Sequence, residues 1–322
     1  MISIIRGNHD SPYGLSGVAV SADGKYTGVV SATGQNAYYY QNGTPILGDE
    51  WATVRSGGQN VATSDDGQYY VAGIGHGNNN NVLFYDLGNL KPHNYRGWTN
   101  HETWQYTTYN SIHDSGLKNP PSDPHDPLGV HVAISADGRN VAAVSEDSRV
   151  YYFNQSGTLL WSNITGYSLE NVAMSTDGQY VAAASRDHNV YFFNASGFRL
   201  WNFTAGNVVK SVSVTADGQY ITAGSDDSAI YLLGKDGTLR WKYSTEGPVE
   251  TVAMSRDGQT IAAGSDDHTL YCFNQSEMLL WTYQTGGKVR SVAVSGDGKY
   301  IVAGSEDGNV YFFSREGSDK TV

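Results

Sequence analysis

Several features that define other protein classes are scarce in this chain of 322 residues. A single cysteine, Cys272, excludes an internal disulfide framework and any zinc or iron–sulfur site built from several cysteines. The 20 lysines and arginines are outnumbered by 32 aspartates and glutamates, and the net charge of −12 disfavours nucleic acid or an anionic membrane as the main partner. No apolar run approaches the roughly 20 residues that a membrane helix needs.

Helical periodicity is missing as well, and only 8 prolines occur. The chain is rich instead in glycine, with 38 residues, and in tyrosine, with 23. This composition is typical of short strands joined by tight turns. An aromatic content of 12% is too high for a disordered chain, so we expect a globular all-β protein.

An Asp-Gly pair recurs along the chain in a frame close to Val-Ala-x-Ser-x-Asp-Gly. Its aspartates are Asp23, Asp66, Asp137, Asp177, Asp217, Asp257 and Asp297. The last four steps between them are each 40 residues long, after steps of 43 and 71. Such regularity indicates seven copies of one unit. The copies start near residues 17, 60, 131, 171, 211, 251 and 291.

Each copy predicts four strands. In the copy around Asp177 these are residues 172–175, 180–185, 190–194 and 198–204, and Asp-Gly forms the first hairpin turn. Antiparallel units of four strands can hide their edges by closing radially. We therefore predict a seven-bladed β-propeller that occupies residues 1–322 as a single domain.

The two ends of the chain suggest how such a propeller closes. The seventh copy has three predicted strands and then a polar tail at 315–322, from which we expect no fourth strand. Residues 2–6 precede the first copy and have no local partner. We expect this N-terminal segment to supply the outer strand of the last blade, because an unpaired edge invites aggregation.

Two stretches of the repeat carry a resemblance to known families. They are Gly-Ser-Asp-Asp-x-x-Leu-Tyr at 264–271 and Gly-Thr-Leu-Arg-Trp at 237–241. The repeats resemble those of WD-repeat propellers and, in the second half, of quinoprotein-like propellers. The resemblance implies the propeller fold and no particular function. A quinone-dependent dehydrogenase of that kind would be longer, with eight blades and a vicinal cysteine pair, so we expect no cofactor.

Residues that recur at every copy are expected to support the fold. Trp161, Trp201, Trp241 and Trp281 share one position of the fourth strand, where we expect packing between blades rather than a ligand-binding ladder. The aspartates of the second turn should fix that turn by accepting backbone hydrogen bonds; they are Asp147, Asp187, Asp227, Asp267 and Asp307. The residue before each of them is Glu146, Arg186, Asp226, Asp266 or Glu306. This row predicts a broken anionic ring on one face. The ring could form a weak cation site or bind a basic partner, or it could be a solvated acidic rim that aids solubility.

The step of 71 residues interrupts the repeat with 31 extra residues. We place them within 75–130: in the second turn (76–81), in the third turn (88–101) and between Trp104 and Val132. The first and last insertions share the face of the acidic rim. Insertions of this kind form binding loops. Candidate binding residues are His76, Trp98, Tyr109, His113, Asp114, His125, Asp126, Glu146, Asp226, Asp266 and Glu306.

Two His-Asp pairs in the last insertion, His113-Asp114 and His125-Asp126, combine imidazole and carboxylate as a divalent metal site would. Their spacing matches no known metal motif, and four prolines nearby suffice to explain a stiff loop. Cys272 lies within a predicted strand, and no serine sits in a nucleophile elbow. We therefore expect neither a catalytic constellation nor a bound metal.

These observations favour a non-enzymatic module that binds a protein or a glycan through the loops of the second and third blades. Two alternatives are a metal-assisted lyase or hydrolase at the propeller mouth and a self-associating structural protein of the cell surface. The first residues lack the features of a secretory signal. We expect either an intracellular protein or a mature or trimmed fragment, and the polar, lysine-poor composition with six Asn-x-Ser/Thr sequons favours a trimmed cell-surface protein.

Overall fold

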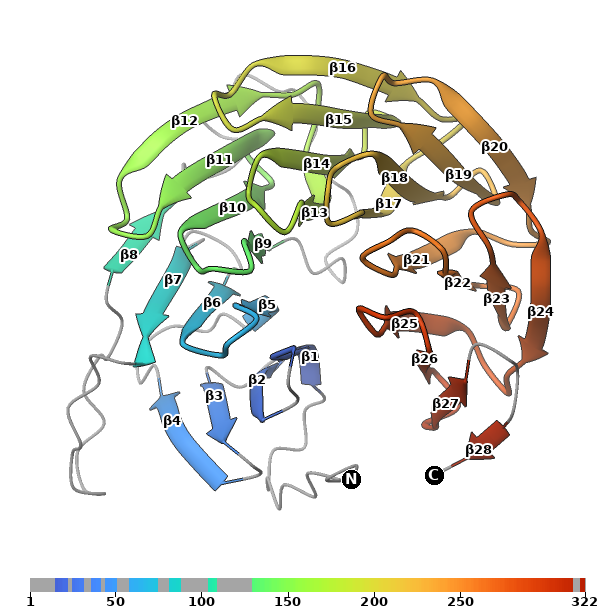
Figure 1. Cartoon of the computed structure of the whole chain (residues 1–322), viewed down its shortest axis with the longest axis horizontal. Coiled ribbons are helices and arrows are strands. Elements are labelled where there is room, and N and C mark those ends of the chain that lie inside the picture. Colours follow the sequence, from blue (N-terminus) through green and yellow to red (C-terminus); the bar gives the residue numbers. More distant parts are fainter. Residues whose placement is uncertain are drawn as a thin grey trace. The chain divides into compact units, whose positions relative to one another are not determined.

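The computed structural model describes residues 15–22, 25–31, 36–41, 44–50, 58–74, 81–87, 104–108, 129–314 and 319–321. These residues form 28 β-strands and no α-helix, so no helix among them could cross a membrane (Figure 1). The chain divides into two compact units, Met1–Ile164 and Thr165–Val322. Each unit contains complete four-stranded antiparallel sheets, which we call blades and number in chain order.

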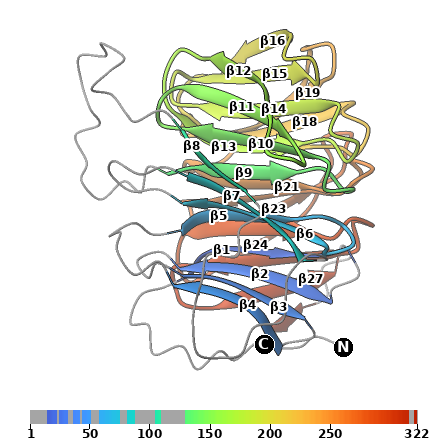
Figure 2. The ribbon, with the colours of Figure 1, turned by 90° about the vertical axis from the view of Figure 1, so that its left-hand side faces the viewer.

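The first unit holds blades 1 to 3, whose strands run side by side in chain order (Figure 2). Blade 1 comprises β1 (Leu15–Val20), β2 (Tyr26–Ser31), β3 (Asn36–Gln41) and β4 (Thr44–Glu50). Blade 2 comprises β5 (Gly58–Thr63), β6 (Tyr69–Ile74), β7 (Asn81–Asp86) and β8 (Trp104–Thr107). Blade 3 comprises β9 (His131–Ile134), β10 (Asn140–Ser145), β11 (Arg149–Asn154) and β12 (Leu159–Ile164).

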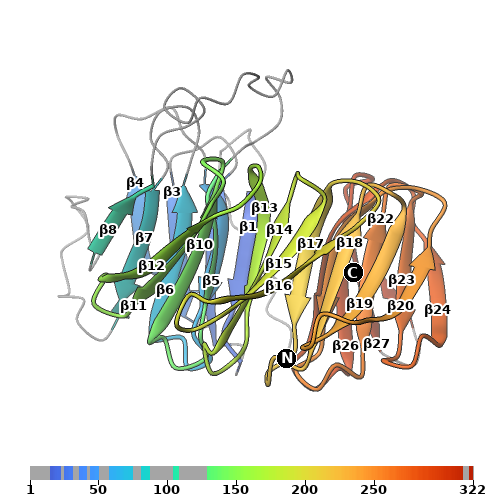
Figure 3. The ribbon, with the colours of Figure 1, turned by 90° about the horizontal axis from the view of Figure 1, so that it is seen from above.

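The second unit holds blades 4 to 7; Figure 3 shows β18, β19 and β20 as neighbours in one of them. Blade 4 comprises β13 (Leu169–Met174), β14 (Tyr180–Ser185), β15 (Asn189–Asn194) and β16 (Arg199–Thr204). Blade 5 comprises β17 (Val209–Val214), β18 (Tyr220–Ser225), β19 (Ala229–Gly234) and β20 (Leu239–Ser244). Blade 6 comprises β21 (Val249–Met254), β22 (Ile261–Ser265), β23 (Thr269–Phe273) and β24 (Leu279–Gln284). Blade 7 comprises β25 (Val289–Val294), β26 (Tyr300–Ser305), β27 (Val310–Ser314) and β28 (Asp319–Thr321).

The predicted seven four-stranded blades of a β-propeller are thus confirmed. The strand bounds also agree closely with those predicted around Asp177. The main difference is β13, which starts at Leu169, three residues before the expected position. Leu169 pairs with Ser185, and an irregularity in the register then separates Leu169 from Asn171. This break removes the alternation of apolar and polar residues that would reveal the start of a strand.

Blade 7 differs from the sequence-based expectation at its outer edge. The expectation that the C-terminal tail contributes no strand was wrong, because β28 pairs with β27 from Tyr311↔Thr321 to Phe313↔Asp319. A three-residue strand in a polar tail has no apolar pattern of its own, and only pairing with β27 defines it. Residues 2–6, for which we predicted this outer position, lie outside the described residues.

The Asp-Gly turn between the first two strands owes its shape to side-chain hydrogen bonds. In blade 4, the Ser175 hydroxyl donates to Asp177 Oδ1 at 2.7 Å, and the same oxygen accepts the backbone N–H of Gln179 at 3.0 Å. Gly178 follows with φ of 73°, a conformation that a side chain would disfavour. The geometry of the first turn therefore explains why serine, aspartate and glycine recur there.

Neighbouring blades within a unit are joined at these turns. In the second unit, the backbone N–H of Thr176 donates to the carbonyl of Ala216, Ala216 to Arg256, and Arg256 to Gly296, at 2.8–3.1 Å. The first unit has the same chain of bonds from Ala22 to Asp65 and from Asp65 to Ala136. Each blade is thereby held in register with the next at one end.

The core lies between blades and is made by their middle strands. All six residues of β19 are buried, whereas every residue of the outer strand β16 is exposed or half-buried. One cluster in the second unit joins Phe192 of blade 4 to Val209 and Ile221 of blade 5. Since a single four-stranded sheet cannot bury both of its faces, each blade depends on its neighbour for stability.

The described strands also place the three insertions. The residues assigned to them fall between β6 and β7, between β7 and β8, and between β8 and β9. Turns between second and third strands lie at the same end of a blade as the connections to the next blade. The first and third insertions therefore leave the first unit at one end of the strands, and the second insertion leaves at the other.

Candidate functional site

Most of the predicted binding residues belong to the insertions. Seven of them lie outside the described residues: His76, Trp98, Tyr109, His113, Asp114, His125 and Asp126. The other four, which follow second strands, are described. Glu146 follows β10 in the first unit, and Asp226, Asp266 and Glu306 follow β18, β22 and β26 in the second.

The aspartates of the second turn have a structural role, as predicted. In blade 6, Asp267 Oδ1 accepts the backbone N–H of Thr269 at 2.8 Å, and Oδ2 accepts the hydroxyl of Tyr271 at 2.7 Å. The same tyrosine bond forms in the other described copies; the pairs are Tyr151–Asp147, Tyr191–Asp187, Tyr231–Asp227 and Tyr311–Asp307. This tyrosine was not among the residues predicted to support the fold, although the spacing Asp-x-x-x-Tyr recurs every 40 residues.

The second-turn aspartate also binds the loop that leads into its own blade. Asp227 Oδ2 accepts the backbone N–H of Gly206 at 2.9 Å, and Asp307 Oδ2 accepts that of Gly286 at 2.7 Å. The hydrogen bond from the Tyr311 hydroxyl, supported by the backbone N–H groups of Asn309 and Gly286, lowers the pKa of Asp307 to about 2. These carboxylates hold the blade through hydrogen bonds to backbone N–H groups and to a tyrosine hydroxyl, which is the structural role expected of them.

The tryptophans of the fourth strand pack between blades, which confirms the structural interpretation. Trp241 is 6% exposed, and its Nε1 donates to the carbonyl of Gln275 in the next blade at 2.9 Å. Trp201 makes the equivalent bond to Lys235 at 2.8 Å, and Trp104 in the first unit to Gln155 at 2.9 Å. The indoles thus cross-link successive blades and do not form a ladder for ligands.

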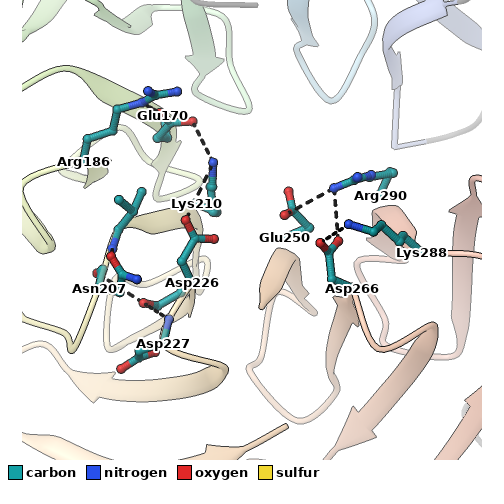
Figure 4. Close-up of polar contacts among 12 residues, drawn as sticks. Glu170, Arg186, Asn207, Lys210, Asp226, Asp227, Glu250, Asp266, Lys288 and Arg290 are labelled. Carbon is teal, nitrogen blue, oxygen red and sulfur yellow. Dashed lines mark hydrogen bonds and ion pairs between the residues drawn. The ribbon is translucent and has the colours of Figure 1, made fainter. Parts of the chain in front are cut away.

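Charged side chains gather in the second unit at the end of the blades that carries the second turns (Figure 4). They form two rows. The strand row, on the first strands of blades 4 to 7, consists of Glu170, Lys210, Glu250 and Arg290. The turn row, directly after the second strands, consists of Arg186, Asp226, Asp266 and Glu306. Lys288, just before β25, adds one more cation.

Blades 4 and 5 share one network of ion pairs. Glu170 pairs with Arg186 of its own blade, and Lys210 Nζ lies 4.0 Å from Oε2 of Glu170 and 4.0 Å from Oδ2 of Asp226. Lys210 therefore bridges the two blades. The side chains of Glu170 and Arg186 are 15% and 14% exposed, so this pair is largely screened from solvent.

Blades 6 and 7 share a second network, centred on Arg290. Its guanidinium lies 3.3 Å from Glu250, 3.1 Å from Asp266 and 2.7 Å from Glu306. Lys288 Nζ also contacts Asp266. This network is more open than the first, since the side chains of Arg290 and Glu306 are 41% and 47% exposed.

No ion pair joins the two networks across blades 5 and 6, both of which the structure describes completely. Acidic groups lie on either side of this gap. Burial raises the pKa of Asp226, and the charges of Glu170 and Asp266 add to the effect against the opposing influence of Lys210. Burial likewise raises the pKa of Glu250, which Arg290 opposes. The cations nearby thus neutralise the negative charge of Asp226 and of Glu250 only in part.

The anionic ring expected from the turn row is therefore a mixed-charge surface in the second unit. The prediction of an anionic ring rested on the turn row alone and did not include the cations of the strand row. Reading the position seven residues before each Asp-Gly pair would have revealed them. The corresponding residues of blades 1 to 3 are Ser16, Gln59 and Val130, so this charge pattern belongs to blades 4 to 7 alone.

Within the described ranges, no three histidine, cysteine, aspartate or glutamate side chains are grouped as a metal ion would require. The two His-Asp pairs of the insertion lie outside those ranges, so the expectation that they bind no metal stays a prediction.

Comparison with protein families identifies the repeat. Residues 96–320 match the family model of the outer membrane protein assembly factor BamB. The chain belongs to this family. The BamB-family match takes in every strand from β8 to β27 and most of β28. It confirms the resemblance to quinoprotein-like propellers in the second half of the chain and extends it into blade 2. No curated protein matches the chain.

Proposed function

We propose that this chain is a non-enzymatic propeller that binds another protein through the inserted loops of blades 2 and 3. The name of the matched family describes an assembly factor for other proteins, and protein binding is the property that this proposal takes from it. Fold-level likeness alone specifies no partner. The proposal therefore depends on where this chain departs from its own repeat.

The observation that carries the proposal is that the repeated polar side chains form hydrogen bonds within and between blades. The second-turn aspartates bind backbone N–H groups and tyrosine hydroxyls, and the tryptophans bind carbonyls of the next blade. These groups hold the blades together. The residues that could recognise a partner are therefore expected in the insertions, where the sequence departs from the repeat. Insertions between β6 and β7 and between β8 and β9 leave the same end of the strands, where they can act on one partner.

The candidate contact residues on these loops are those proposed from the sequence. His76, Tyr109, His113 and Asp114 belong to the insertions at that end, together with His125 and Asp126. Tyrosine and tryptophan side chains are enriched at the centres of protein interfaces, where they bury apolar area and still donate hydrogen bonds. A protein is therefore the partner class that this loop set fits best, with a glycan as the alternative.

The test is a comparison of partner capture by three forms of the chain. One is intact, one lacks residues 110–127, and one carries a Gly/Ser segment of the same length in their place. Proteins from native material that bind the intact chain and neither variant, while all three melt at the same temperature, would support the proposal. Equal capture by all three forms would contradict it. Lys299→Glu, on the first turn of blade 7 and 72% exposed in its side chain, is the control.

The rival hypothesis of a metal-assisted lyase or hydrolase is distinguished by elemental analysis of the purified chain. We expect no stoichiometric metal and no effect of a chelator on the melting temperature. One equivalent of a divalent metal that is lost in the His113→Ala variant would favour the enzyme instead.

A further inference from the structure

The strand row alternates in charge from blade to blade. Its residues are Glu170, Lys210, Glu250 and Arg290, and adjacent members belong to neighbouring blades. Two positions further along the same strands, all four blades carry valine: Val172, Val212, Val252 and Val292. The alternation is therefore confined to one position of an otherwise uniform strand. Packing of the blades alone does not require it, since blade 3 carries Val130 at the same position, fully buried.

This order of charges is complementary to itself when reversed. From blade 4 to blade 7 the signs run negative, positive, negative, positive, and from blade 7 to blade 4 they run in the opposite sense. Consider a two-fold axis that lies in the plane of contact between two copies and passes between blades 5 and 6. It places Glu170 opposite Arg290 of the second copy and Lys210 opposite Glu250 of the second copy. A two-fold contact repeats each pair, so four attractive contacts result.

The turn row follows the same rule at its ends. The same axis places Arg186 opposite Glu306 of the second copy, again a pair of opposite charges. Asp226 faces Asp266 of the second copy, which is a like-charged pair. Asp266, however, already contacts Lys288 and Arg290 within its own chain, and these cations offset the repulsion. Three of the four kinds of contact are thus attractive.

The two rows are more nearly balanced in charge than the chain as a whole. The chain carries −12 overall, which repels a second copy at long range. The nine residues of the two rows and Lys288 comprise five acids and four bases, with a net charge of −1. The second-turn aspartates and Glu246 lie at the same end of these blades and add negative charge, so the attraction between copies depends on the short-range pairing of the rows.

The side chains are ordered before any contact forms. Arg290 is held by three carboxylates and Lys210 by two, so their long side chains lose less freedom on binding than free ones would. The loops that precede blades 4, 5 and 7 expose Gly166, Gly206 and Gly286 at one equivalent position. These residues carry no side chain that could shield the rows, whereas the loop before blade 6 carries the exposed Glu246 at the same position.

We propose that this face of blades 4 to 7 associates with the same face of a second copy, in a two-fold arrangement set by the alternating charges. Electrostatic complementarity fixes orientation and association rate more than affinity, so the dimer is weak and sensitive to salt. The inference concerns the second unit only and does not depend on the proposed function of the inserted loops.

The first experiment is sedimentation velocity of the full chain over a concentration series. At an ionic strength of about 0.01 M charges act over about 30 Å, whereas at about 1 M they act over about 3 Å. We expect dimers that increase with concentration at the lower ionic strength and disappear at the higher one. A monomer at both ionic strengths, or a dimer that is unchanged by salt, would overturn the proposal.

The second experiment exchanges charges at one contact. Glu170→Lys and Arg290→Glu each create two like-charged contacts per dimer, so each variant alone should associate at least about tenfold more weakly. An equimolar mixture of the two variants restores both contacts and should dimerise like the parent chain. The double variant, in which Lys at 170 faces Glu at 290, should do so as well. Lys299→Glu, at the other end of the blades, should leave dimerisation unchanged.

The mixture separates loss of the contact from loss of the fold. Misfolded single variants would show altered melting and would not recover on mixing. If both single variants are folded and dimerise normally, or if both are folded and the mixture and the double variant stay monomeric, the two-fold pairing of Glu170 with Arg290 is wrong.

Discussion

The hydroxyl of Tyr271 on β23 donates a hydrogen bond of 2.7 Å to Oδ2 of Asp267, four residues earlier in the second turn. The same carboxylate accepts the backbone N–H of Thr269 and that of Glu246, which lies in the loop leading into blade 6. One aspartate therefore fixes the turn, the start of the third strand and the connection from the preceding blade. Burial and the hydrogen bond to Asp267 together raise the pKa of Tyr271, so its hydroxyl stays protonated as a donor.

Removing this hydroxyl should destabilise blade 6 measurably. Tyr271→Phe deletes a hydrogen bond to a charged acceptor, and such bonds contribute about 1.5–3 kcal/mol. We expect a loss of that order in the free energy of unfolding, measured by denaturant titration. Tyr243→Phe is the matched control, because the Tyr243 ring contacts Tyr271 but its hydroxyl forms no hydrogen bond to the described residues. Equal losses in the two variants would show that the aspartate bond is unimportant.

The tryptophan that joins blades 5 and 6 should contribute more than any exposed aromatic residue. Trp241→Ala removes a side chain that is 6% exposed and its hydrogen bond to Gln275, so we expect a loss of about 3–5 kcal/mol. Phe198→Ala, at a residue that is 68% exposed, should change stability by less than about 0.5 kcal/mol. Similar effects of the two substitutions in the same denaturant titration would contradict the interblade role of Trp241.

Much of this architecture could be predicted because residues close together in the sequence determine the turns of each blade. Asp177 and Gly178 specify their own turn through bonds within five residues, and the 40-residue step repeats that turn in the next blade. The positions of the three insertions followed from the same frame. The hydrogen bond between Tyr271 and Asp267, four residues apart, was also predictable in principle, since this spacing recurs in every regular copy.

Interactions between blades were harder to foresee. The pairing of Lys210 with both Glu170 and Asp226 depends on how far neighbouring first strands lie apart, which no local pattern encodes. For the same reason the surface around the turn row was expected to be more anionic than it is, because Lys210 and Arg290 of the strand row were not taken into account. The strand β28 was missed because its three polar residues become a strand only through β27. Tertiary context, rather than propensity, decides such elements.

The third position of the second turn should accept glycine without loss. His268 adopts φ of 68°, and Gly308 adopts φ of 83° at the equivalent position of blade 7. Glycine tolerates this left-handed conformation, while a β-branched residue does not. We expect His268→Gly to stay within about 0.5 kcal/mol of the parent chain, because relief of strain offsets the added freedom of the unfolded chain. His268→Val should lose about 1–3 kcal/mol. Denaturant titration of both variants checks this, and a stable His268→Val variant would contradict it.

The low pKa of Asp307 should depend on Tyr311. The hydrogen bond from the tyrosine hydroxyl is the main reason that the pKa of Asp307 is about 2, below its ordinary value of 3.8. Tyr311→Phe should therefore raise the pKa of Asp307 towards that value, as followed by NMR titration of the carboxyl carbon. Asp297 is an internal control. Its pKa is also about 2, but it is lowered by Lys299 and Ser295 and should not change. An unaltered pKa of Asp307 in the variant would assign the shift to the backbone donors instead.

The carboxyl of Asp226 should make the protein less stable as the pH rises. Burial raises the pKa of Asp226 above its ordinary value of 3.8, so the folded state holds this proton more tightly than the unfolded state does. The free energy of unfolding therefore falls as the pH rises through the unfolded pKa towards the folded one.

Asp226→Asn does not titrate, so its stability relative to the parent chain should improve between about pH 3 and pH 7, by on the order of 1 kcal/mol or less. Denaturant titrations across this range give the difference directly. Asp297→Asn is the opposite control: because the hydrogen bond from Lys299 lowers the pKa of Asp297 to about 2, this variant should become less stable relative to the parent chain over the same range. A difference that moves in the same direction for both variants would contradict the assignment of burial as the dominant influence on Asp226.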